Sequence, residues 1–172
     1  MISQKIIKAL NDQVAMEAAA SQKYLALAIW CDLQAMEQSA QFMFRQADEE
    51  RAHMMKFIDY ILEMGADAVS PGIELPRNEY KDIKEVIEFA YSNEQAVTKS
   101  INNIVDLALA ENDHQTSSFL QWFVDEQREE EAMFRKILDK ITLIGTGSMS
   151  NYYIDMEIGK VDAEVLAQEA AE

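Results

Sequence analysis

Apolar residues recur every three or four positions through most of this chain, which is the spacing of one face of an α-helix. Four long stretches carry the pattern, at about residues 3–36, 38–64, 82–111 and 115–144. Glycine and proline, which interrupt helices, are absent from residues 4–64 and 82–144. With 172 residues, of which 49% are apolar, the chain is predicted to form a single all-α domain (residues 1–172) built on four long helices.

The expected ends of these helices carry local signals. Ser3 is a residue type that caps helix N-termini, and Asp82 with Glu85 forms a capping box before the third helix. Gly65 follows the second helix, where a glycine commonly ends one. No glycine or proline separates the first two helices, so we place their boundary near Met36, where the apolar face of the first helix runs out.

One connection is much longer than the others. The 17 residues at 65–81 contain both prolines and would span roughly 56 Å when extended at about 3.3 Å each. The second helix is roughly 39 Å long at about 1.5 Å per residue, so this connection can return along the whole bundle. We therefore predict two antiparallel hairpins joined by one long crossover. A short fifth helix is predicted at about residues 151–160, followed by a tail at 161–172.

Charged residues interrupt the predicted apolar faces at one level. Glu17 does so in the first helix, and Glu50 and His53 do so three positions apart in the second. A shift of 77 residues (94 − 17 = 77) carries these three positions, in order, onto Glu94, Gln127 and Glu130. Such a repeat is typical of a duplicated helix pair, and it places one polar level on four core faces.

This polar level predicts a site for two metal ions. Burying four glutamates without compensation costs on the order of several kcal/mol per charge. Protonation is one remedy, and two divalent cations are another, since their charge balances four carboxylates beside a neutral imidazole. Oxygen donors with one imidazole and no thiolate fit iron(II) or manganese better than structural zinc.

The two ions are expected to be held unequally. Glu50 is the natural bridge, with Glu17 and His53 completing the first ion's ligands and Glu94 and Glu130 completing the second's. A symmetric site would have Glu-x-x-His in the fourth helix, but Gln127-x-x-Glu130 stands there instead. The second ion therefore lacks a histidine and is predicted to bind more weakly. Gln127 is a poor ligand that can hydrogen-bond a bound water or oxygen species.

Several polar neighbours of this level allow two interpretations. Glu49, Glu126 and Glu129 are either solvated acids at the helix edges or part of a third, outer metal position that shares Glu130. Tyr24 lies seven residues after Glu17 on the same face, where it either packs in the core or acts as a redox-active neighbour of the metals.

Composition narrows the possible partners and location. The formal net charge of −16 repels nucleic acid and anionic membranes and attracts cations. No run of 18 apolar residues occurs, and the one cysteine, Cys31, continues the apolar face of the first helix. We expect a cytoplasmic protein with a buried thiol, no membrane segment and no nucleic-acid partner.

Over residues 2–160 the chain resembles the ferritins, and specifically the non-haem bacterial ferritins. The resemblance rests on Glu17 with Tyr24, on the segment 49–53 (EERAH), on Glu94 and on the segment 119–131 (FLQWFVDEQREEE). It implies a ferritin-like four-helix bundle that oxidises Fe(II) with O2 or H2O2. It also implies a shell of 24 identical subunits in which ferric mineral is stored.

The resemblance also assigns roles to single residues. The implied ligands are Glu17, Glu50 and His53 for the first iron; Glu50, Glu94 and Glu130 for the second, with Gln127 beside it; and Glu49, Glu126, Glu129 and Glu130 for a third. Tyr24 matches a tyrosine that the family has near this site.

Two departures from related proteins limit what the resemblance implies. Haem-carrying bacterioferritins have a methionine directly after the bridging glutamate, where this chain has Arg51, so haem is not expected. Animal ferritins have acids lining an iron channel where this chain has Ser117 and Leu120, so the route by which iron enters stays open.

Two alternative functions remain. One is another ferritin-like di-iron oxidase or peroxidase without storage, although a single cysteine excludes a rubrerythrin. The other is a non-catalytic helical assembly protein.

Overall fold

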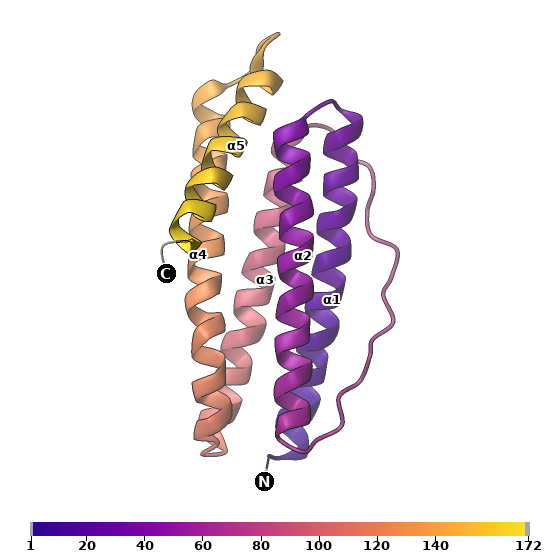
Figure 1. The fold of residues 1–172 in the computed structure, drawn as a ribbon, viewed down its shortest axis with the longest axis vertical. Coiled ribbons are helices and arrows are strands. Elements are labelled where there is room, and N and C mark those ends of the chain that lie inside the picture. The colour runs from indigo at the N-terminus through magenta and orange to yellow at the C-terminus, as the bar shows by residue number, and fades with distance from the viewer. Residues whose placement is uncertain (1, 171–172) are drawn as a thin grey trace.

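The computed structural model describes residues 2–170 and contains five helices. They are α1 (Gln4–Leu33), α2 (Glu37–Glu63), α3 (Ile83–Ala110), α4 (His114–Ile144) and α5 (Ser150–Glu169). The first four form an elongated bundle, with α5 against its upper part (Figure 1). The predicted all-α four-helix bundle with a shorter fifth helix is confirmed. None of the described helices is long and apolar enough to cross a membrane.

The predicted caps explain where the helices begin. Ser3 accepts a hydrogen bond from the backbone N–H of Ile6 at 3.3 Å, and Asp82 accepts one from that of Glu85 at 2.9 Å. The first helix ends at Leu33, three residues before the predicted boundary. The reason is Ala35, which adopts a φ of 58° and reverses the chain without a glycine.

The long crossover runs along the outside of α1 from one end of the bundle to the other (Figure 1). Asn11 of α1 fixes its first part, since its amide donates to the carbonyl of Asp67 at 3.0 Å and accepts from the N–H of Val69 at 2.7 Å. Near its far end, Tyr80 is buried and meets Trp30 edge-on at 6.1 Å between ring centroids. The crossover thus joins two antiparallel hairpins, as predicted.

The fifth helix continues nine residues beyond its predicted end at residue 160. Val161 is buried in the same apolar cluster as Ile154 and Ile158, and Val165 packs against that cluster. The predicted tail is therefore helical as far as Glu169, because its apolar residues continue the stripe that packs on α2 and α4. Residues 171–172 of that tail lie outside the described part of the chain.

The apolar core is divided into two clusters. One contains Leu10, Phe57, Ile101 and Phe123 among others, and lies toward the end of the bundle where α1 begins. The other contains residues from all five helices and lies toward the end where α1 meets α2. Along each of the first four helices the change from one cluster to the other falls at the predicted polar level, so that level separates the two halves of the core.

Candidate metal centre

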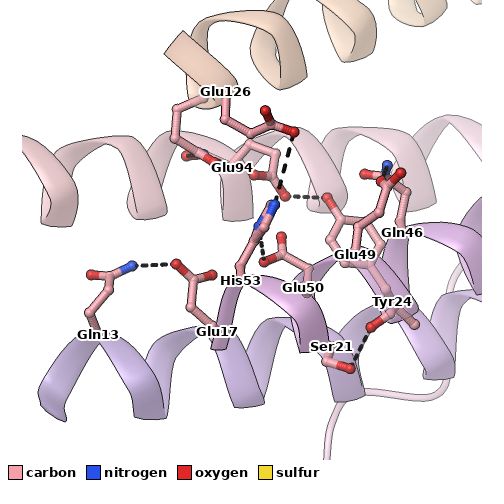
Figure 2. Close-up of polar contacts among 12 residues, drawn as sticks. Gln13, Glu17, Ser21, Tyr24, Gln46, Glu49, Glu50, His53, Glu94 and Glu126 are labelled. Atoms are coloured by element: carbon pink, nitrogen blue, oxygen red, sulfur yellow. Dashed lines mark hydrogen bonds and ion pairs between the residues drawn. The ribbon is translucent and has the colours of Figure 1, made fainter. Parts of the chain in front are cut away.

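The polar level brings together side chains from four helices. Glu17 of α1 and Glu94 of α3 are fully buried, and Glu50 and His53 of α2 are 4% and 5% exposed. Gln127 of α4 is buried as well. Figure 2 shows Glu17, Glu50 and His53 pointing from α1 and α2 toward the helices that carry Glu94 and Glu126. The 77-residue repeat in the sequence therefore does correspond to a single layer in space.

Three of these residues form a compact set of possible metal ligands. Glu17, Glu50 and His53 each offer one ligand atom, and these atoms lie within 4.8 Å of one another. His53 Nδ1 is 3.4 Å from Glu50 Oε2. Metal–ligand bonds to oxygen and nitrogen are about 2.1 Å long, so an ion fits among the three atoms after small side-chain rotations.

Buried lone pairs in this layer lack donors. Glu17 Oε2, Glu50 Oε2 and Glu130 Oε2 are all inaccessible to solvent, and within residues 2–170 none has a hydrogen-bond partner. A buried acceptor that forms no hydrogen bond is costly and uncommon in folded proteins. Cations that coordinate these oxygens would remove the cost, which is the reason that the donor set fits metal ions.

Two residues that sequence reasoning missed hold Glu17 in place. Gln13 Nε2 donates to Glu17 Oε1 at 2.9 Å, and Ser100 of α3 donates to Gln13 Oε1. This relay fixes the amide of Gln13 and occupies one oxygen of Glu17, which leaves the other oxygen open. The available signal was Gln13 itself, a polar residue one helical turn before Glu17 on the same buried face.

Glu94, a predicted ligand of the second ion, accepts hydrogen bonds on both of its carboxylate oxygens. Tyr24 donates its hydroxyl to Glu94 Oε1, and Gln127 Nε2 donates to Glu94 Oε2 at 3.0 Å. Tyr24 is thus fully buried and also bonded to a predicted ligand, so packing and contact with the site are combined in one residue. Gln127 acts here as a donor, with its amide nitrogen directed at Glu94.

Burial controls the protonation of these groups. It raises the pKa of Glu17 to about 7, against a hydrogen bond from Gln13 that lowers it. It also raises the pKa values of Glu50 and Glu130 well above their usual range, helped in both cases by the charge of Glu94. Burial lowers the pKa of His53 to about 4, so its imidazole is neutral at physiological pH, as metal ligation requires. The metal-free site therefore holds protons where metal ions would bind.

The outer acids lie beside this layer. Glu126 Oε1 is 3.9 Å from His53 Nε2, while Glu129 is exposed and pairs with Arg128 at 3.1 Å. Glu126, Glu129 and Glu130 share the lining of a cavity of about 410 Å³ between α4 and α5. Glu49 accepts hydrogen bonds from Arg45 and Gln46 of its own helix. Three of the four predicted acids thus border one cavity, whereas Glu49 is held by donors of its own helix.

Comparison with known proteins identifies the family. A family model for the ferritin-like domain matches residues 7–144. This chain belongs to the ferritin family. A probable bacterial non-heme ferritin-like protein of Haemophilus influenzae is 41% identical over 164 residues, which covers 95% of this chain and 99% of the relative. A bacterial non-heme ferritin of Campylobacter jejuni is 38% identical over 161 residues, which covers 94% and 96% respectively.

Solved structures agree with this ferritin assignment. An open pore ferritin from the hyperthermophilic archaeon Archaeoglobus fulgidus has a TM-score of 0.89 and 34% identity, covering 92% of this chain and 98% of the other. The resemblance to the non-haem bacterial ferritins is therefore confirmed. Leu120, one of the two residues that stand where animal ferritins have channel acids, lies in the apolar core of this ferritin.

Proposed function

We propose that this ferritin stores iron, and that it oxidises Fe(II) at the buried layer before storage. The observation that carries the proposal is the triad of Glu17, Glu50 and His53. Each of its two carboxylates has a buried oxygen without a hydrogen-bond donor among the described residues, and these oxygens lie near the neutral imidazole of His53. Glu94 and Glu130 lie across the bundle as the ligands of a second ion, with Glu50 as the bridge. The bacterial non-heme ferritin at 38% identity supports iron as the cargo.

The proposed reaction takes one electron from each of two Fe(II) ions. When O2 is the oxidant, it accepts both electrons and two protons and leaves as H2O2. When H2O2 is the oxidant, the same two electrons and two protons yield two waters. The protein holds the two substrate ions at one place, keeps bulk water out, and exchanges carboxyl protons for metal charge as each ion binds.

Storage requires an enclosed space, which one chain of this shape does not provide. We propose that 24 copies assemble into a hollow shell in which ferric mineral collects, in the cytoplasm. The family and the similarity to a solved ferritin over nearly the whole chain support such a shell. Because Glu49, Glu126, Glu129 and Glu130 lie beside the paired site, we propose them as a third iron position.

An anaerobic Fe(II) titration, followed by rapid mixing with O2, tests the oxidation step. We expect at least two bound irons per subunit, and rapid oxidation that is lost in His53→Ala and Glu50→Ala. The chain supplies a matched control, because its only other histidine, His114, is exposed at the start of α4. His114→Ala should oxidise iron as the wild type does. Fewer than two irons per subunit would refute the paired site.

Native mass separates storage from the alternatives. Size-exclusion chromatography with light scattering should show a shell of about 24 chains that retains iron after oxidation. A monomer or dimer that still oxidises iron would instead be a ferritin-like oxidase or peroxidase without storage. An assembled particle that neither binds two irons nor oxidises them would be a non-catalytic assembly protein.

A further inference from the structure

Glu49 is bound on both of its carboxylate oxygens. Arg45, one helical turn earlier on α2, donates to Glu49 Oε1, and the buried amide of Gln46 donates to Glu49 Oε2. The side chains of Arg45 and Glu49 are 18% and 29% exposed, so this pair is largely shielded from water. A metal ion that binds Glu49 therefore competes with two donors that already hold its carboxylate, one of them positively charged.

Arg45 has a second carboxylate partner on a different helix. Its Nε donates to Asp162 Oδ1 at 2.7 Å, and its Nη2 donates to the same oxygen. Asp162 is on the part of α5 that lies beyond the predicted end of that helix, and its side chain is 16% exposed. The guanidinium group thus bridges α2 and α5, with Glu49 on one side and Asp162 on the other.

The bridge stands next to the other acids of the proposed third position. Burial, followed by the charges of Glu94, Glu49 and Glu126, raises the pKa of Glu130, and Arg45 acts against them. Glu130 Oε2 is buried, with no hydrogen-bond partner among the described residues. Glu126, Glu129 and Glu130 line the cavity of about 410 Å³, and α5 forms its far wall. The acids of α4 therefore border a space next to the helix that carries Asp162.

We propose that Arg45 is the internal counter-ion of the third iron position, holding Glu49 while that position is empty and remaining on Asp162 when an ion takes Glu49. Arg45 is then a positioning residue that sets how tightly the third ion binds. This inference rests on the proposed function, because it concerns the outer ion of the same centre.

Charge accounting supports this exchange. Carboxylates that lie close together in a poorly solvated place need a cation, and the guanidinium supplies one without any metal. A divalent ion at the same place competes with it for Glu49. The released guanidinium would be costly if it were left alone, but Asp162 already accepts two of its N–H groups and continues to pair with it. The pair on α5 therefore makes the exchange reversible.

The test is anaerobic Fe(II) titration of the assembled full-length protein, compared across variants. Arg45→Gln removes the competing charge and should tighten the third bound iron by about tenfold, equivalent to about 1.4 kcal/mol. Asp162→Asn removes one carboxylate that competes with Glu49 for the guanidinium, so Arg45 should hold Glu49 more tightly and the third iron should bind more weakly than in the wild type. In the Arg45→Gln background, Asp162→Asn should have no further effect on the third iron.

Two controls separate charge from loss of structure. Arg45→Lys keeps the positive charge, and it should leave the third iron as weakly bound as in the wild type. Lys140→Gln removes a different ion pair of α5, the one between Lys140 on α4 and Glu157 at 3.1 Å, and should change no iron affinity. The first two irons should bind and oxidise at wild-type rates in all of these variants.

Two outcomes overturn the inference. One is a third iron that binds no more tightly in Arg45→Gln than in the wild type, including the case in which neither binds a third iron. The other is the same gain in Arg45→Lys as in Arg45→Gln. If the first two irons bind and oxidise normally in these experiments, the proposed function survives. If the wild type itself does not bind the first two irons, the proposed function is refuted.

Discussion

Glu17→Gln should stabilise the metal-free protein while it weakens iron binding. The substitution keeps the size of the side chain, and the new amide oxygen can still accept the hydrogen bond from Gln13. It removes a carboxyl group that is fully buried and whose second oxygen has no hydrogen-bond partner among the described residues. The carboxyl group that the metal-bound state needs as a ligand therefore destabilises the metal-free state.

The sign and size of the gain follow from linkage. Glu17 has a pKa of about 7 in the folded protein against an ordinary value of 4.5, so between these values the folded state keeps a proton that the unfolded chain has released. Stability therefore falls as pH rises through this interval, and it is lowest above about pH 7. The cost grows by about 2 to 3 kcal/mol between pH 5 and pH 8, since each pKa unit is worth about 1.4 kcal/mol. Glutamine does not titrate and escapes that cost.

Thermal unfolding in excess chelator measures this gain. For a chain of this size, about 2 to 3 kcal/mol corresponds to a rise of roughly 5 to 10 °C in the unfolding midpoint at pH 8. The rise should be much smaller at pH 5, where the folded protein already holds the proton. Glu88→Gln, an exposed acid of α3 that pairs with Lys84 at 3.5 Å, should change the midpoint little at either pH. A midpoint at pH 8 that is unchanged or lower in Glu17→Gln would refute the reasoning.

Three further results are expected. Fe(II) affinity should fall as pH drops below about 7, because burial raises the pKa values of Glu17 and Glu50 and protons then compete with the metal; titrations at two pH values check this, and equal affinities would contradict it. Gln13→Ala should weaken the first iron about tenfold by releasing Glu17, as loss of a residue that supports a ligand commonly does; an unchanged binding isotherm would exclude the relay. Val161→Asp should undock α5 because it buries a charge in the apolar cluster; unchanged hydrogen-exchange protection across α5 would show that this packing is unimportant.

The bundle and its polar layer could be predicted because each helix carries its own evidence. An apolar stripe interrupted at Glu50 and His53 is visible within one helix, and the 77-residue repeat aligns the helices without any knowledge of their packing. Burial and contacts depend on the same periodic spacing, so Glu17 and Glu94 are where the pattern predicts. Contacts between residues far apart in the sequence were not needed to predict the bundle and its polar layer.

The end of α5 and the bridge made by Arg45 could not be predicted in the same way. Val161 and Val165 lie in a segment that also contains Asp162 and Glu164, and they become a helical face only against α2 and α4. The partner of Arg45 on α5 is 117 residues away in sequence. The simultaneous pairing of Arg45 with Glu49 and Asp162 depends on side-chain conformations that no local pattern encodes.

The structure also predicts an order in which the iron positions fill. At the triad, Glu17 Oε2 and Glu50 Oε2 have no hydrogen-bond partner in the described chain, so an ion there displaces protons alone. At the second position, Glu94 is bonded to Tyr24 and Gln127, and those bonds must rearrange. At the third, the ion also competes with a guanidinium for Glu49. The triad alone breaks no hydrogen bond and the third position alone competes with a charged donor, so the triad should fill first and the outer position last.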